Sequence, residues 1–307
     1  DEQRLENLCY FDLTGGEDLI LVAFGMLAQK YGLPIHEYDV EEDRLISFAN
    51  GSKHKIDETA EEQKIKLKID DILAMQGGCI NYGKQKSYKM DVDEEYLKKE
   101  IMDMWQIAKI NATKWNQFSA VLKACKRYTN DKGRVVVSER EWKKVIENNN
   151  TNRHNVEKYL KELHEIKVMT VHGDLEGFVE YSFKNEGIEM CILDAGCLLE
   201  LVTYYDRKNQ YGDSDVRIGV HLDWNGIIEK KNVENEVDVM VLDKNIPIFI
   251  SCKNGNVQPT ALYELDTIAE EMGGKYAKKE LVVGEAISEE IAKRAKQMDI
   301  AVKVVCG

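Results

Sequence analysis

Two consecutive apolar strands, within residues 235–253, constrain the fold of this chain more than any other feature. The segment reads NEVDVMVLDKNIPIFISCK, and its Asp-Lys-Asn at 243–245 supplies a polar turn. Successive strand residues point to opposite faces, so Glu236 and Asp238 share one face. A hairpin this apolar is normally half of a buried sheet, where a charged side chain must be solvated in a cleft, paired, or bound to a metal. The segment therefore predicts a sheet that presents acidic side chains at one face.

The charged residues of this hairpin suit metal-dependent hydrolysis of a phosphodiester. A hard cation such as Mg²⁺ or Mn²⁺ needs anionic oxygen ligands, which Asp238 and a neighbouring carboxylate can supply. Such a metal polarises the phosphate and lowers the pKa of a bound water. Lys253 can orient that water or offset negative charge in the transition state. The alternative is an ordinary hairpin in which Asp238 and Lys253 form a surface salt bridge.

The order of these residues resembles the signature of the PD-(D/E)xK nuclease superfamily, an Asp on one strand followed by (Asp/Glu)-x-Lys on the next. Asp238 matches the first acid and Lys253 matches the lysine, whereas Ser251 stands where the second acid is usual. A serine hydroxyl is a weak, neutral metal ligand, so the resemblance implies that Glu236 or Glu200 assists Asp238.

The same resemblance implies roles for the two residues before the lysine. Ser251 would hydrogen-bond the attacking water or a metal-bound water, and the main-chain carbonyl of Cys252 would add an oxygen ligand. The expected catalytic residues are therefore Asp238, Lys253, Glu200 and Ser251.

Glu200 lies on a helix predicted before the hairpin, because Leu198, Leu201 and Val202 recur at helical spacing. The superfamily usually carries a glutamate on this helix in a Gly-x-x-x-Glu context, and Gly196-Cys-Leu-Leu-Glu200 has that spacing. The alternative is a solvated glutamate on an amphipathic helix. After the hairpin, helices predicted at 260–272 and 288–298 alternate with strands at 281–283 and 300–305. This alternation predicts a mixed sheet covered on both faces.

The amino-terminal residues read as a strand at 8–13, a Thr-Gly-Gly turn and a helix at 19–31. Backbone N–H groups at such a turn suit a phosphate or another polar ligand group. A tight turn with a helix N-cap is the alternative and needs no ligand.

The segment Asp12-Leu-Thr-Gly-Gly16 resembles the motif of CARF domains, the Rossmann-like sensors of cyclic oligoadenylates in type III CRISPR immunity. The resemblance implies that Thr14, Gly15, Gly16 and Glu17 contact such a ligand, with cyclic tetra-adenylate expected. It also implies a homodimer, because the symmetric ligand lies across a two-fold axis. Family members commonly continue with Thr-Lys, where this chain has Glu-Asp at 17–18. Since the motif begins close to the first residue, we expect the natural domain to start before this sequence.

The middle of the chain predicts helices at 93–107, 115–128, 138–145 and 153–166, followed by a hairpin at 168–183. This order suggests a winged-helix-like module, which could contact DNA through its last helix and its wing. A packing or relay role is the alternative, and we favour it because residues 153–166 mix lysines with glutamates. We therefore expect an α/β protein with a partial Rossmann-like CARF domain at 1–92, a winged-helix-like module at 93–187 and a PD-(D/E)xK, restriction-endonuclease-like domain at 188–307.

Composition narrows the function further. The chain has 42 Lys and Arg against 55 Asp and Glu, a formal net charge of −13, which argues against a constitutive, high-affinity nucleic-acid binder. Its seven cysteines form no Cys-x-x-Cys pair, which is typical of free thiols in a reducing cytoplasm. No apolar run reaches membrane-spanning length, so no membrane partner is expected.

Together these features predict a cytoplasmic, homodimeric, metal-dependent endonuclease that cyclic oligoadenylate activates allosterically and that cleaves DNA or RNA in antiviral defence. The alternative is a ligand-responsive, nucleic-acid-binding regulator in which Ser251 marks a degenerate nuclease domain.

Overall fold

The computed structural model describes residues 11–14, 18–40, 44–49, 52–55, 67–172, 178–226 and 233–305 of the 307. The chain divides into two compact units. The first contains the described residues up to Leu67 together with Lys244–Ile246, and the second contains Lys68–Asp243 and the described residues from Pro247 onward.

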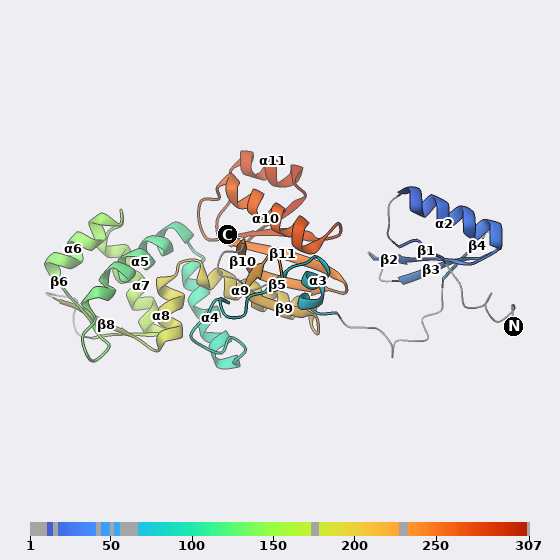
Figure 1. Ribbon diagram of the computed structural model, residues 1–307. Helices are drawn as coiled ribbons and strands as arrows, with labels where there is room; N and C mark the ends of the chain where they lie inside the picture. The colour runs from blue at the N-terminus through green and yellow to red at the C-terminus, as the bar shows by residue number, and fades with distance from the viewer. Residues whose placement is uncertain are drawn as a thin grey trace. The chain divides into compact units, whose positions relative to one another are not determined.

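The first unit is a four-stranded sheet with one helix (Figure 1, blue). Its elements are β1 (Phe11–Asp12), α2 (Asp18–Tyr31), β2 (Ile35–Asp39), β3 (Arg44–Ala49) and β4 (Ser52–Lys55). β1 and β2 are parallel and α2 joins them, whereas β2, β3 and β4 pair antiparallel. A parallel pair needs such a crossover, and a helix is the usual one. The predicted strand and helix are thus confirmed for the residues described, and the turn between them lies outside the described residues except for Thr14.

The second unit contains a six-stranded sheet in the order β13-β12-β11-β10-β9-β5. The strands are β5 (Cys79–Ile80), β9 (Asp215–Asp223), β10 (Glu234–Asp243), β11 (Ile246–Lys253), β12 (Lys278–Val283) and β13 (Ile300–Val304). β9 and β10 are antiparallel, while β11, β12 and β13 are parallel. The expected hairpin is therefore β10–β11, and the expected mixed sheet is confirmed.

Helices cover both faces of this sheet (Figure 1). The helices nearest to it are α3 (Ile69–Met75), α9 (Cys197–Tyr211), α10 (Pro259–Gly273) and α11 (Glu289–Gln297). Val239 and Ile250 face the core that contains Leu198 of α9. Phe249, on the alternate face, lies against Gly273 of α10, where an added Cβ would come within 2.5 Å of its ring. Buried apolar side chains therefore line both faces, as expected for a covered sheet.

The middle of the chain has the strand and helix order of a winged helix. Its elements are α4 (Glu95–Ala108), α5 (Ala112–Cys125), the 3₁₀ turn η2 (Lys126–Tyr128), β6 (Val135–Ser138), α6 (Glu139–Asn148), α7 (Arg153–Glu165), β7 (Met169–Val171), β8 (Phe178–Phe183) and α8 (Glu186–Leu193). The three strands form an antiparallel sheet in the order β6-β8-β7. Ser138 caps α6 and Asn152 caps α7, which sets where each helix begins. The predicted helices and hairpin are confirmed, and the turn at 173–177 lies outside the described residues.

The domain boundaries expected at residues 92 and 187 stay predictions. The division between the two units falls after Leu67, because β5 pairs with β9 and so joins the larger sheet. One continuous hydrophobic cluster contains Trp115 and Phe118 of the middle module together with Leu198 of the carboxyl-terminal part. Residues 93–187 and 188–305 therefore share a core.

Two further expectations concern cysteines and membranes. The five described cysteines, at 79, 125, 191, 197 and 252, are free thiols. Within the described ranges, no helix combines the length and the apolar character that crossing a bilayer requires.

Candidate active site

β10 and β11 bring Asp238 and Lys253 together. Oδ2 of Asp238 lies 3.8 Å from Nζ of Lys253. The same oxygen accepts a hydrogen bond from the main-chain N–H of Cys252 at 2.6 Å and one from the hydroxyl of Ser251 at 3.4 Å. The Lys253 side chain is 40% exposed and that of Asp238 is 15% exposed. The carboxylate is thus fixed within the sheet while the ammonium group reaches solvent.

The surroundings of Asp238 favour a nearby cation. Burial raises the pKa of Asp238, and the charge of Lys253 and the N–H of Cys252 oppose that rise. The carboxylate of Glu236 raises the pKa of Asp238 further. A positive ion at this position would relieve both the burial cost and the repulsion between carboxylates.

Glu200 is buried in the first turn of α9, so the alternative of a solvated glutamate is wrong. Its Oε2 accepts hydrogen bonds from Nζ of Lys86 at 2.6 Å and from the hydroxyl of Tyr88 at 2.8 Å. Burial raises the pKa of Glu200, Lys86 lowers it, and the charge of Asp238 raises it. The two carboxylates therefore interact, while the direct partners of Glu200 are Lys86 and Tyr88.

Lys86, which links three of the acidic side chains, was not predicted from the sequence. Its Nζ lies 2.6 Å from Glu200 Oε2 and 3.3 Å from Asp194 Oδ2, and its charge also lowers the pKa of Asp238. Burial favours the neutral amine, but Glu200 and Asp194 outweigh burial and raise the pKa of Lys86. Gly219 of β9 permits this approach, because its φ is +60° and a Cβ there would lie 2.8 Å from the Lys86 Cβ.

Glu264 is a second functional candidate that was not predicted from the sequence. A small cavity of about 30 Å³ is lined by Asp238, Glu236, Ser251, Lys253 and Glu264. Its size suits one or two small species such as a water or an ion. Glu264 lies on α10, the helix that directly follows β11. The only sequence signal for it was an acidic residue near the start of that helix.

The donor set fits a hard divalent cation in chemistry but is not preassembled as a cluster. Among the described residues, no three carboxylate, imidazole or thiol groups lie close enough together to hold a metal ion. Asp238, Glu236 and Glu264 line one cavity, and Glu200 is held by Lys86. Carboxylate oxygens are the ligands that Mg²⁺ and Mn²⁺ prefer. The roles of Asp238, Glu236, Glu200 and the Cys252 carbonyl as ligands stay predictions.

The expected ligand-contacting turn is described only at its first residue. Thr14 donates its hydroxyl hydrogen to Asp12 Oδ1 at 2.5 Å and accepts a hydrogen bond from the main-chain N–H of Tyr38 at 2.8 Å. Hydrogen bonds from Thr14 lower the pKa of Asp12. The other expected contacts, Gly15, Gly16 and Glu17, lie outside the described residues. Contact of all four with a cyclic oligoadenylate stays a prediction.

Comparison with known proteins finds one family model that matches the carboxyl-terminal part. Residues 189–305 match the family model of the Card1-like endonuclease domain. A search of curated protein sequences found no match.

Two solved structures resemble the whole fold. Protein VC1899 from Vibrio cholerae is 17% identical with a TM-score of 0.71, and the match covers 96% of this chain and 71% of that one. Can2 from Sulfobacillus thermosulfidooxidans, in complex with cyclic tetra-adenylate, is 16% identical with a TM-score of 0.61, and the match covers 98% of this chain and 75% of that one. At these identities the likeness shows a shared fold. Residues 189–305 are therefore similar to the Card1-like endonuclease domain, within a fold that the chain shares with VC1899 and Can2.

Proposed function

We propose that this protein is a metal-dependent endonuclease that cyclic oligoadenylate activates, and that it degrades DNA or RNA in type III CRISPR antiviral defence. The observation that supports this most directly is the contact of Asp238 with Lys253 inside a Card1-like endonuclease domain. A carboxylate and an ammonium group on one sheet face provide the two charges that phosphodiester hydrolysis needs.

In this proposal Asp238 holds Mg²⁺ or Mn²⁺, with Glu236, Glu264 or Glu200 as further carboxylates. When bound, such an ion polarises the phosphate and acidifies a water. Lys253, whose side chain is 40% exposed, orients the attacking water and offsets negative charge that develops on the phosphate.

The residues around this pair hold the site in place. Ser251 donates a hydrogen bond within the site, and the N–H of Cys252 fixes the orientation of Asp238. Glu264 offers the negative charge that Ser251 lacks, because both side chains line the same cavity.

Activation by cyclic tetra-adenylate is part of the same proposal. The similar protein Can2 was solved in complex with cyclic tetra-adenylate, and this chain shares its fold. A ligand with two-fold symmetry needs two copies of the chain, so we propose an active homodimer in which ligand binding shifts the population of the cleavage-competent state. Free thiols at the described cysteines favour a cytoplasmic protein.

Cleavage of plasmid DNA and of single-stranded RNA tests the proposal, with Mn²⁺ and with or without cyclic tetra-adenylate. Wild-type protein should degrade at least one substrate when both additions are present. Asp238→Ala and Lys253→Ala should abolish cleavage without unfolding the protein. Lys278→Ala, an exposed lysine on the neighbouring strand β12, is the matched control and should cleave normally. Wild-type rates in the Asp238 or Lys253 variant would contradict the assignment.

A ligand-responsive regulator is the second candidate, because Ser251 replaces an acid and the middle module has the element order of a winged helix. The ion pairs of the basic residues in α7 argue against recognition of a DNA sequence by this helix. Arg153 pairs with Glu139 and Glu157, and Lys158 lies 3.7 Å from Glu162. A specific gel shift without any cleavage would select the regulator.

A further inference from the structure

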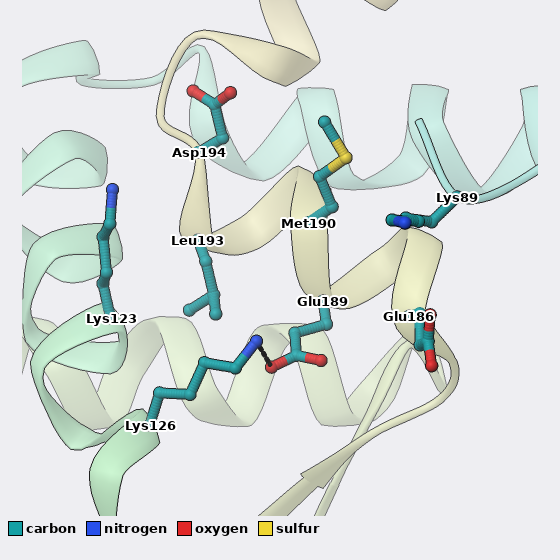
Figure 2. A pocket seen from close by; sticks show the side chains of 8 residues that line it. All are labelled: Lys89, Lys123, Lys126, Glu186, Glu189, Met190, Leu193 and Asp194. Carbon is teal, nitrogen blue, oxygen red and sulfur yellow. Dashed lines mark ion pairs between the residues drawn. The ribbon is translucent and has the colours of Figure 1, made fainter. Parts of the chain in front are cut away.

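A second, larger pocket lies beside the candidate active site. Its volume is about 510 Å³, and we call it the lysine groove because Lys89, Lys123 and Lys126 line it. Figure 2 shows Lys123 and Lys126 on one side of this groove and Lys89 on the other, with Met190 between them. Lys123 and Lys126 come from α5 and η2, and Met190 comes from α8. Helices α5 and α8, the turn η2 and the segment that carries Lys89 thus form the groove together.

Two of the three lysines are available to an anionic ligand. Lys126 is paired with Glu189 at 2.9 Å. Lys89 and Lys123 are exposed, and neither has a carboxylate within salt-bridge distance among the residues that the structure describes. The chain as a whole carries a formal net charge of −13. Three carboxylates, those of Glu186, Glu189 and Asp194, also line the groove, and Glu189 pairs with Lys126 while Asp194 pairs with Lys86. Glu186 therefore stands against Lys89 and Lys123, which leaves the groove a local excess of one positive charge on an otherwise acidic protein.

The groove and the candidate active site are linked through Asp194 and Lys86. Asp194 lines the groove and also lies 3.3 Å from Nζ of Lys86. Lys86 in turn holds Glu200 at 2.6 Å. Lys86 thus contacts both Asp194, at the groove, and Glu200 of the candidate active site.

The helix that carries Lys123 is fixed to the strand that carries Lys253. The side-chain amide of Asn116 in α5 donates to the main-chain carbonyl of Asn254, the residue after Lys253, and accepts a hydrogen bond from the Asn254 side-chain amide. Asn254 also donates to the carbonyl of Ala195 at 2.8 Å. Lys123 follows Asn116 by seven residues, about two helical turns, so both lie on the same face of α5. Lys123 is thus held at a defined position, about 10 Å along the helix from the asparagine contact.

We propose that the lysine groove binds the sugar-phosphate backbone of the substrate strand beside the catalytic centre, with Lys89 and Lys123 contacting phosphates. This proposal rests on the proposed nuclease function. It gives the middle module a role in substrate binding through α5, whereas a winged helix that reads sequence would use α7.

Binding of a fluorescein-labelled single-stranded oligonucleotide, followed by anisotropy in EDTA across a range of salt concentrations, tests the groove. DNA and RNA oligonucleotides of the same sequence form two arms. Each lost phosphate contact lowers the slope of log Kd against log salt by about 0.7 for a single strand. Lys89→Ala/Lys123→Ala should therefore lower the slope by about 1.4. Its binding should be roughly tenfold weaker than wild type at physiological salt and similar to wild type near 1 M.

A variant that should bind the oligonucleotide more tightly and a matched control complete the experiment. Glu189→Gln releases Lys126 from its ion pair, so it should tighten binding and raise the slope by about 0.7. Lys143→Ala/Lys144→Ala removes two exposed lysines of α6 and should leave the slope unchanged.

Three outcomes would contradict the proposal that the groove binds the substrate strand. They are no binding by wild-type protein, an unchanged salt slope in the Lys89/Lys123 variant, or an equal loss of affinity and slope in the Lys143/Lys144 variant. Cleavage is not part of this measurement. Failure of the proposed function would show separately, as a strand that the wild-type protein binds but leaves intact with Mn²⁺.

Discussion

Replacing Lys86 with methionine should destabilise the second unit by an amount that depends on pH. The change removes the ammonium group that lies 2.6 Å from Glu200 and 3.3 Å from Asp194. Glu200 is buried, so it is left either as a buried charge without its cation or as a protonated acid. Breaking a buried pair by removing one partner typically costs about 3–5 kcal/mol.

Protonation of Glu200 sets an upper limit on this loss. A glutamate with an unfolded pKa of about 4.3 takes up a proton at pH 7 at a cost of about 3.7 kcal/mol, at about 1.36 kcal/mol per pH unit. At pH 5.5 the same cost is about 1.6 kcal/mol. Burial raises the folded pKa of Glu200, so the folded variant binds more protons than the unfolded chain at any pH between the unfolded pKa and the folded pKa. Stability of the variant relative to wild type must therefore fall as pH rises from about 4.3 through the folded pKa.

Urea unfolding followed by tryptophan fluorescence measures this effect on the relevant unit. The four tryptophans, at 105, 115, 142 and 224, all lie in the second unit. Lys86→Met should lose up to about 3.7 kcal/mol at pH 7 and no more than about 1.6 kcal/mol at pH 5.5. Glu200→Gln in the same background should restore most of the loss at pH 7, because a neutral amide needs no counterion.

Lys84→Met is the matched control, since Lys84 lies on the same segment and pairs with Glu234 at 2.5 Å. The Lys84 side chain is 51% exposed, and exposed pairs contribute about 0–1 kcal/mol. An equal loss for Lys86→Met at both pH values would refute the reasoning. So would a loss in Lys84→Met as large as that in Lys86→Met.

Three more predictions follow from the same structure. Glu264→Gln should weaken Mn²⁺ binding, measured by calorimetry, whereas Glu270→Gln elsewhere on α10 should not; equal affinities in both variants would remove Glu264 from the ligand set. Ser251→Asp should place another carboxylate beside Asp238, lowering the metal-free melting temperature at pH 7 and increasing the rise that Mn²⁺ produces; an unchanged response to Mn²⁺ would refute this. Asn254→Ala should lower the free energy of unfolding by about 1–3 kcal/mol, because partners including Asn116 are left unsatisfied, and an unchanged urea midpoint would show that this link is dispensable.

Local patterns predicted the secondary elements that carry the site. Alternation of apolar and polar residues located β10 and β11, because side chains in a strand alternate between faces. Helical spacing after Gly196 placed Glu200 in the first turn of α9. The contact between Asp238 and Lys253 could be predicted because a short turn joins β10 and β11, so the residues of the two strands lie side by side.

The partners of these residues could not be predicted in the same way. Lys86 and Tyr88 lie more than 100 positions before Glu200, and no periodicity relates a side chain to a contact that distant. The pairing of β5 with β9, which draws residues 79–80 into the larger sheet, could not be predicted from the sequence for the same reason.

The sequence by itself therefore determined which side chains share a strand face or a helix turn, since those relations depend on the backbone period alone. Tertiary structure decided that Glu200 is buried against Lys86, that Glu264 faces the same cavity as Asp238, and that lysines of α5 line a groove at Asp194. These relations depend on how the sheet is ordered and which helices cover it, and burial of apolar surface over the whole chain sets both.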